Sequence, residues 1–286
     1  MTLPSSLAEI MTPDPVTLSI PGSRDDLIEA IRKYKHRSFP IVKDDKLLGV
    51  AGRSELFKKT GETQLAVLLT RLNQGVSAVP PETTIKRAAQ HFLKNRQGCL
   101  LVTENDRLVG IVTVSDIIGK VIANAEISGQ IESYFSRDFT CIWEGTRCDI
   151  AGIILLNSGQ NAIPILSDGA KITGIFGWHD LLQFAEERST EHISSTTSSA
   201  EYKPGSWDSE TVLVIGSKLL ELPSLPLLSI LSPKKLITAY ESASIIDCAK
   251  KMKKHQISQI PVISADGTLK GLLTGNDLLQ AYLELG

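Results

Sequence analysis

The feature that most constrains the fold of this chain is a segment that recurs four times along its 286 residues. Each copy combines a short β-rich entry, an amphipathic helix, an apolar strand, a polar turn and a second apolar strand. In every copy a carboxylate stands six residues after a glycine of that second strand, and aliphatic residues follow it. A self-similar pattern of this kind predicts a repeat architecture. The four segments are Gly49–Glu55, Gly110–Asp116, Gly174–Asp180 and Gly271–Asp277.

The strand before the turn also recurs. Its copies are Phe39–Val42, Cys99–Val102, Ile163–Leu166 and Ile260–Ile263, with proline at the second position in three copies and Leu100 in the second. Polar turns of four residues separate the two strands, which predicts antiparallel hairpins. Helices are expected upstream from the spacing of apolar residues. The pattern predicts an α/β (α+β) fold of β-α-β-β-α units.

The intervals between the four acidic residues are 61, 64 and 97 residues, so an insertion separates the last two copies. It begins with a Ser/Thr-rich stretch, Ser194–Ser199, which is typical of a flexible linker. A strand is expected at Thr211–Ile215. The expected limits are 1–62 and 63–126 for copies one and two, 127–188 for copy three, 189–228 for the insertion and 229–286 for copy four.

A single copy, at about 55 residues, is too small to bury both faces of its strands and helices. Pairing two copies through their apolar strands would cover that surface. We expect copies one and two to pair, and copies three and four to pair. The insertion is no obstacle to the second pair, because the entropy cost of closing a loop grows slowly with its length.

These segments resemble cystathionine-β-synthase-type repeats, known as CBS domains. The resemblance rests on Met11–Thr17, Phe39–Val42, Gly110–Asp116, Ile260–Ile263 and Gly271–Asp277. It implies paired repeats called Bateman modules, here two, which could pack as a pseudo-symmetric disc, alone or as a dimer. It also implies clefts between paired repeats that hold AMP, ADP, ATP or S-adenosylmethionine.

The threonine and aspartate at the end of the second strand have a use in such a cleft. A helix start offers free N–H groups and a positive dipole that suit a phosphate, and a carboxylate suits two ribose hydroxyls. The alternative is an ordinary helix N-cap. Full matches occur in copies two and four, with candidate residues Thr113, Ser115, Asp116, Thr274, Asn276 and Asp277.

Copies one and three depart from this pattern. Gly52 replaces the threonine in copy one, where the acid is Glu55, and Gly177 replaces it in copy three, where Asp180 remains. We therefore expect at most one good site per pair. The residues around Asp180 could make a distinct site, and the alternative is that Trp178 packs against its neighbours.

The other side of each cleft is implied by the family resemblance to come from the entry segments and from the residues before the first strand. Arg37 is the best candidate for a phosphate, because a guanidinium presents paired donors; the alternative is a surface arginine. The second module is less basic and could prefer a less charged ligand. The implied residues are Asp14, Val16, His36 and Arg37 in the first module, and Arg137, Gln160, Asn161, Ser258 and Gln259 in the second.

Composition limits the other function classes. The net charge of −2 gives no reason to expect nucleic acid or an anionic membrane as the main partner. The four cysteines and five histidines form no metal-binding pattern, and no catalytic or nucleotide-hydrolysing motif is present. No signal peptide is visible at Met1–Ile10. We expect a cytoplasmic, non-catalytic regulatory protein without a resident cofactor, a homodimer with an unidentified regulated partner. The alternative is a ligand-independent interaction scaffold.

Overall fold

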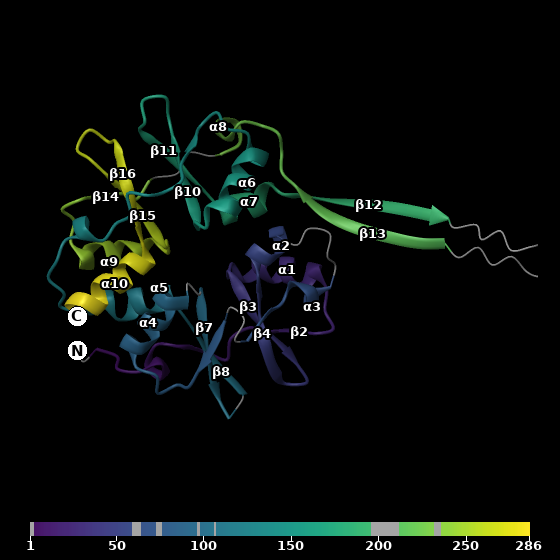
Figure 1. The fold of residues 1–286 in the computed structure, drawn as a ribbon, viewed down its shortest axis with the longest axis horizontal. Coiled ribbons are helices and arrows are strands. Elements are labelled where there is room, and N and C mark those ends of the chain that lie inside the picture. Colours follow the sequence, from purple (N-terminus) through teal and green to yellow (C-terminus); the bar gives the residue numbers. More distant parts are fainter. Residues whose placement is uncertain are drawn as a thin grey trace, which may run out of the picture.

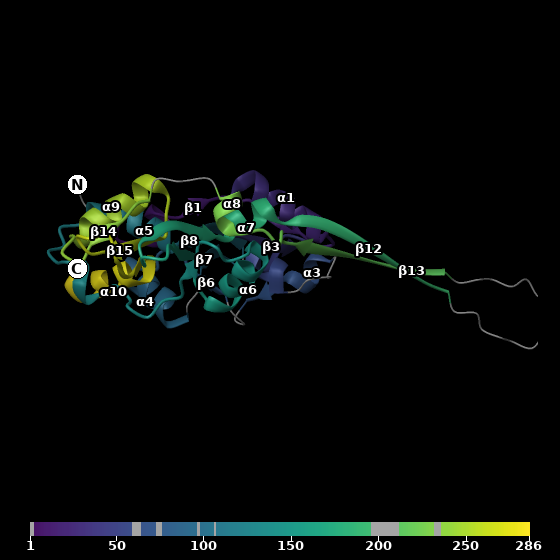
Figure 2. The same cartoon turned by 90° about the horizontal axis from the view of Figure 1, so that it is seen from above.

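The computed structural model describes residues 3–58, 64–72, 76–95, 98–105, 107–195, 212–231 and 236–286. The described part forms a flattened body from which one two-stranded ribbon projects (Figures 1 and 2). The N- and C-termini lie on the same side of the body, opposite the ribbon. Among the described residues, no helix has the length and apolar character needed to span a membrane.

The first module contains repeats one and two. Repeat one holds β2 (Leu18–Ser19), α1 (Arg24–Tyr34), β3 (Ser38–Lys43), β4 (Lys46–Gly52) and α2 (Arg53–Lys58). The connection to repeat two holds α3 (Leu65–Leu68) and β5 (Thr70–Arg71). Repeat two holds β6 (Ser77–Val79), α4 (Ile85–Asn95), β7 (Cys99–Glu104), β8 (Arg107–Thr113) and α5 (Val114–Lys120), and β1 (Thr12–Pro13) precedes both repeats.

The second module repeats this order. Repeat three holds β9 (Ile142–Trp143), α6 (Cys148–Ser158), β10 (Ala162–Leu166), β11 (Ile172–Gly177) and α7 (Trp178–Phe184). Repeat four holds β14 (Ala239–Tyr240), α9 (Ile245–His255), β15 (Gln259–Ile263), β16 (Leu269–Thr274) and α10 (Gly275–Leu285). The predicted fold class of four β-α-β-β-α units in two modules is confirmed.

The hairpin turns have the backbone geometry that the sequence predicts. Asp44 and Asp45 between β3 and β4 have φ values of 48° and 60°, and Asn105 between β7 and β8 has 49°. Short polar residues tolerate this left-handed region better than most, and two such residues fit the twist of a tight hairpin.

The strand register corrects one sequence alignment. Gly49 pairs with Ile41 in repeat one, and Gly110 pairs with Val102 in repeat two. Counting back from these glycines places Leu101, not Leu100, at the position of Pro40. The expected correspondence of Leu100 with the proline was therefore wrong by one residue, because copy two has no proline to fix the alignment.

In the first module the two repeats exchange their entry segments, and in the second module the entry to repeat three contacts repeat four. In the first module β1 pairs with β8 of repeat two, and β5, beyond the expected limit at residue 62, pairs with β4 of repeat one. In the second module Ser136, from the entry to repeat three, bridges to Leu272 of repeat four. The two sheets of the first module also share a small apolar cluster around Val76, Cys99 and Leu101. The predicted pairing of consecutive repeats is thus present in the structure.

The main apolar cores lie between the modules. One core joins α4 and α5 of repeat two to α9 and α10 of repeat four, with Phe92 and Leu278 both fully buried in it. The other joins repeats one and three, with Phe39 and Leu155 fully buried. The helices of both modules therefore meet along the middle of the flattened body.

The insertion forms a projecting ribbon and a short return to the body. The ribbon is made of β12 (Glu186–Ser195) and β13 (Val212–Glu221), and the first two residues of the stretch expected to be a flexible linker, Ser194 and Ser195, end β12. The rest of the Ser/Thr-rich stretch lies outside the described residues. The strand expected at Thr211–Ile215 corresponds to β13, which is longer.

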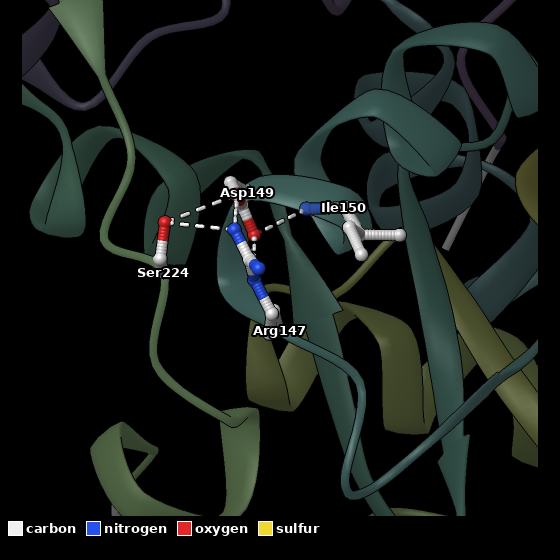
Figure 3. Close-up of polar contacts among 4 residues, drawn as sticks. All are labelled: Arg147, Asp149, Ile150 and Ser224. Atoms are coloured by element: carbon white, nitrogen blue, oxygen red, sulfur yellow. Dashed lines mark hydrogen bonds and ion pairs between the residues drawn. The ribbon is translucent and has the colours of Figure 1, made fainter.

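A polar cluster anchors the returning chain to repeat three (Figure 3). Arg147 donates to the Asp149 carboxylate at 2.5 and 3.1 Å and to the Ser224 hydroxyl at 2.9 Å. The hydrogen bond and charge of Arg147 hold the pKa of Asp149 below its ordinary value. Helix α8 (Leu227–Ile230) follows and buries Leu227 in the core of repeats one and three.

Because each core contains helices of both modules, we expect the two modules to unfold in one transition. Leu278→Ala should lower the free energy of unfolding by about 2–5 kcal/mol, because it leaves a cavity in a fully buried site. Leu285→Ala, on the same helix but 48% exposed, is the control and should change it by less than about 0.5 kcal/mol. Calorimetry checks both, and two separate transitions for the two modules would contradict the shared core.

Candidate functional site

The residue immediately before the first long strand occupies an equivalent position in each repeat. These residues are Arg37, Gly98, Asn161 and Ser258, which precede β3, β7, β10 and β15. Arg37 donates from Nη1 to the Asn161 side-chain oxygen at 2.9 Å and from Nη2 to the Ser258 hydroxyl at 2.6 Å. Residues of repeats one, three and four therefore meet at the Arg37 guanidinium. We call Arg37, its partners Asn161 and Ser258, and the nearby Arg53 and Trp178 the polar centre.

The first residue of the helix that follows the second long strand also occupies an equivalent position in each repeat. Arg53 opens α2 and lies over the Trp178 ring that opens α7, with 5.9 Å from the guanidinium carbon to the ring centroid. Val114 opens α5 and faces Gly275 at the start of α10, where an added Cβ would lie 2.8 Å from Val114 Cγ1. Repeat one thus faces repeat three, and repeat two faces repeat four. Of these two facing pairs, only the first carries a charge.

The two arginines share an unusual electrostatic environment. Arg37 is exposed to solvent, yet desolvation by the surrounding protein lowers its pKa. Desolvation, followed by repulsion from Arg37, lowers the pKa of Arg53 to about 10. Within the described part of the chain, neither guanidinium forms an ion pair with a carboxylate. The polar centre therefore concentrates two positive charges that lack a negative counterpart there.

The Thr113 and Asp116 pair is occupied by its own helix. Asp116 Oδ2 accepts hydrogen bonds from the Thr113 backbone N–H at 2.9 Å and from its hydroxyl at 2.7 Å. The Thr113 hydroxyl in turn accepts from the Asp116 N–H, which completes a capping box. Asp116 Oδ1 lies 3.1 Å from Lys120 Nζ. Both oxygens of this carboxylate are thus engaged, as the N-cap alternative expects.

The equivalent pair in repeat four is only half engaged. Asp277 Oδ2 accepts from the Thr274 N–H at 2.6 Å and from the Thr274 hydroxyl at 2.8 Å. Its Oδ1 makes no hydrogen bond or ion pair to any residue that the structure describes. Burial raises the pKa of Asp277 above its ordinary value, against the opposing effect of the Thr274 hydrogen bonds. Ser115 and Asn276, between the members of the two pairs, are exposed.

The remaining sequence candidates are dispersed. Asp180 is buried and accepts a hydrogen bond from the Gly177 N–H at 3.0 Å. Gln259 is also buried and donates to the Ala162 carbonyl oxygen at 2.8 Å, joining repeats four and three. Arg137 forms an ion pair with Glu241 and lies over the Phe135 ring.

Three further candidates, His36, Asp14 and Val16, take no part in the hydrogen bonds of Arg37 described above. His36 is exposed and lies 5.7 Å from the Phe39 ring, centroid to centroid. Asp14 is exposed with a φ of 44°, and Val16 is half-buried against the core of repeats one and three. The sequence predicts Arg37 in one cleft and Asn161 and Ser258 in another, whereas the structure brings these three residues together between the modules.

Arg53 was not predicted from the sequence, because the expected ligand contacts lay at the threonine position, which Gly52 occupies in copy one. The structure gives a reason for that glycine: a Cβ at position 52 would lie 2.5 Å from the Arg37 carbonyl oxygen. The replacement of threonine by glycine in copy one therefore accompanies the close approach of the Arg37 backbone, just before β3. A basic residue directly after a glycine at this position is the signal that would have identified Arg53.

We expect Gly52→Ala to lower the free energy of unfolding by about 1–3 kcal/mol, because the added methyl group must displace backbone rather than a flexible side chain. The matched control is Gly98→Ala, where no atom lies within 4 Å of an added Cβ. Denaturant titration compares the two variants. Equal effects would contradict the close approach of residues 37 and 52.

A raised pKa means that folding favours the protonated form of Asp277. Its contribution to stability is then fully present below the unfolded value near 3.8 and is lost as the pH rises through the raised value. On acidification from pH 7 to about pH 4, wild type should therefore gain stability relative to Asp277→Asn, as urea titrations at both pH values would measure. A relative loss on acidification would show that the fold favours the carboxylate instead.

Comparison with known proteins places this architecture in a family. The CBS domain family model matches residues 7–62, 72–123 and 230–284. Repeat three, which that model does not match, has the same order of elements. A protein of Acidianus ambivalens is 35% identical over 107 residues, which cover 37% of this chain and 65% of that protein.

Two solved structures cover 97% of this chain and 99% of their own length. A conserved protein from Pyrococcus horikoshii is 28% identical with a TM-score of 0.66. Protein MJ1225 from Methanocaldococcus jannaschii is 16% identical with a TM-score of 0.76, and that likeness concerns the fold alone. Because the family model covers more than half of the residues and the fold agrees throughout, this chain belongs to the CBS-domain family.

Proposed function

We propose that this protein is a ligand-sensing regulator that binds the phosphate group of an adenine nucleotide at the polar centre. The observation that carries the proposal is the pair of guanidiniums, Arg37 and Arg53, which lie in dense surroundings without a described carboxylate partner. The phosphate follows from these charges, whereas the adenine moiety follows from membership of the CBS-domain family.

Charge burial supplies the physical reason. Two like charges that are partly removed from water destabilise each other and the fold unless an anion compensates them. A phosphate offers several acceptor oxygens to the paired donors of a guanidinium. Asn161 and Ser258, which accept hydrogen bonds from Arg37, are polar groups that can contribute to binding the same oxygens. Asp277, with one carboxylate oxygen that has no partner in the described structure, is our candidate for the ribose hydroxyls.

Regulation follows from the position of the site between modules. A ligand held by residues of repeats one, three and four would favour one relative arrangement of the two modules. Only a ligand with different affinities for two arrangements can transmit a signal. We propose that this arrangement is what a regulated partner protein reads, without catalysis by the chain itself.

A ligand-independent scaffold is the second candidate. The capping box of Thr113 and Asp116 favours it, because it uses the very groups that the sequence assigns to the ligand. The Asp116–Lys120 ion pair adds to this. On this view the polar centre would only join the two modules.

Calorimetric titration with ATP, ADP, AMP, adenosine and S-adenosylmethionine separates the two candidates. We expect binding of at least one phosphate-bearing nucleotide, and Arg37→Ala should weaken it by at least about tenfold, because a charge-assisted hydrogen bond contributes roughly 1.5–3 kcal/mol. Arg137→Ala removes the same charge outside the polar centre and should leave affinity unchanged. No binding of any of the five compounds would favour the scaffold.

Arg53→Met gives an independent test. It removes an uncompensated charge, so the melting temperature of the ligand-free protein should not fall, although the contact with Trp178 is lost. The rise in melting temperature that nucleotide produces in wild type should be strongly reduced. A variant that melts much lower without ligand but responds normally to nucleotide would show that Arg53 is structural.

A further inference from the structure

Repeat three differs from the other repeats on the outer face of its first helix. The helices α1, α4, α6 and α9 each have eleven residues and bury the same four positions, the first, fourth, fifth and eighth. Their third and sixth residues are exposed in every copy. In α6 these residues are Ile150 and Ile153, which are 45% and 60% exposed. In the other three helices they are polar or charged: Asp26 and Glu29, Arg87 and Gln90, and Asp247 and Lys250.

The segment that returns from the ribbon, Leu222–Leu231, shows the same difference, and we call it the return segment. Its Leu225 and Leu228 are 53% and 68% exposed. The Leu225 carbonyl oxygen accepts a hydrogen bond from the Cys148 N–H at 2.8 Å, and the Leu228 N–H donates to the Glu144 carbonyl oxygen at 3.0 Å. Both leucines therefore lie at the N-terminal end of α6. The corresponding residues beside α4 and α9 are small or polar: Ser5 and Ala8, and Gly129 and Glu132.

We call Ile150, Ile153, Leu225 and Leu228 the apolar patch, which lies on and beside the first half of α6. Ile150 and Ile153 are three residues apart and therefore share one face of the helix. Large apolar side chains gathered on an exposed surface mark an interaction site when the fold does not need them there. Because the equivalent surfaces of the same chain lack them, we attribute these four side chains to contact with another molecule.

The margin of the apolar patch is acidic. Glu144, whose carbonyl oxygen holds the return segment, forms no ion pair with a residue that the structure describes. Asp168 also lacks such an ion pair, and it accepts a hydrogen bond at 2.7 Å from Nε1 of Trp143, the chain neighbour of Glu144. The nearby cation, Arg147, is engaged by Asp149 (Figure 3). A basic partner therefore finds complementary charge at this margin.

Charge also distinguishes this face from the equivalent faces of repeats two and four, which repel a basic partner. The exposed basic residues there are Lys86, Arg87 and Lys94 on α4, and Lys250, Lys253 and Lys254 on α9. A second copy bound through the same patch would bring two acidic margins into one interface, and an anionic membrane would be repelled by the same charges. The occupant that fits is a protein helix with an aliphatic face and basic margins.

We infer that repeat three docks a partner protein at the apolar patch, through a partner helix that has one aliphatic face and flanking lysine or arginine residues. The inference rests on the proposed function for the role of that partner as the regulated protein. The patch itself shares no residue with the polar centre, although α6 ends at Ser158, three residues before Asn161 of that centre. Docking is tested without nucleotide, so either proposal can fail while the other holds.

Fluorescence anisotropy on the full chain with two labelled synthetic peptides tests this docking surface. One peptide is an amphipathic helix of leucine and lysine, and the other has glutamate in place of every lysine. Wild type should bind the lysine peptide at least about tenfold more tightly than the glutamate peptide. Ile153→Ser should weaken binding of the lysine peptide at least about fivefold, because it removes an aliphatic side chain from the contact. Glu144→Gln should reduce the preference for the lysine peptide.

The matched control is Leu285→Ser, which removes an aliphatic side chain that is 48% exposed on α10, outside the apolar patch. It should bind the lysine peptide like wild type. No binding of the lysine peptide by wild type, equal affinity for the two peptides, or equal weakening by Ile153→Ser and Leu285→Ser would each overturn the docking surface. A wild-type dimer that Ile153→Ser dissociates in sedimentation velocity would overturn it in favour of a second copy. Binding to phosphatidylserine vesicles that Ile153→Ser abolishes would overturn it in favour of a membrane.

Discussion

The packing of helices across the two modules is the interaction on which the rest of the structure depends. Helices α4 and α5 bury their apolar faces against α9 and α10, and the helices of repeat one do the same against repeat three. Neither module encloses either of these two cores alone, because each module supplies part of both cores. The polar centre exists only as a result, since Arg37 reaches residues of the other module only when those helices are packed.

Much of the fold could be predicted from local pattern. The glycine-to-carboxylate spacing located all four repeats, and short polar turns such as Asp44–Asp45 fixed the hairpins. Pairing of consecutive repeats followed from the small size of one unit. The choice of partner for each helix could not be predicted, because an apolar stripe shows that a face is buried without showing against what. Residues such as Phe92 and Leu278 carry no mark of the helices that they pack against.

The candidate site was predicted in part, and for a physical reason. Arg37 was identified by its donors, but its partners Asn161 and Ser258 were assigned to a different cleft, since their convergence depends on the same cross-module packing. Threonine and aspartate at a helix start serve capping and ligand binding equally well by sequence. In the structure both pairs complete a capping box, and they differ in the second carboxylate oxygen, which is paired with Lys120 at Asp116 and has no described partner at Asp277. Sequence could not separate these cases, because only the neighbouring side chains distinguish them.

The exchange of entry strands has a consequence for how such chains can change in length. Strand β1 completes the sheet of repeat two, and β5 completes that of repeat one, so neither sheet is whole when its own repeat is cut out of the chain. A duplication or deletion of one repeat would leave a strand without its sheet and a sheet without its strand. Gain or loss of material should therefore be tolerated in whole modules, or as insertions at connections such as the one between α7 and repeat four.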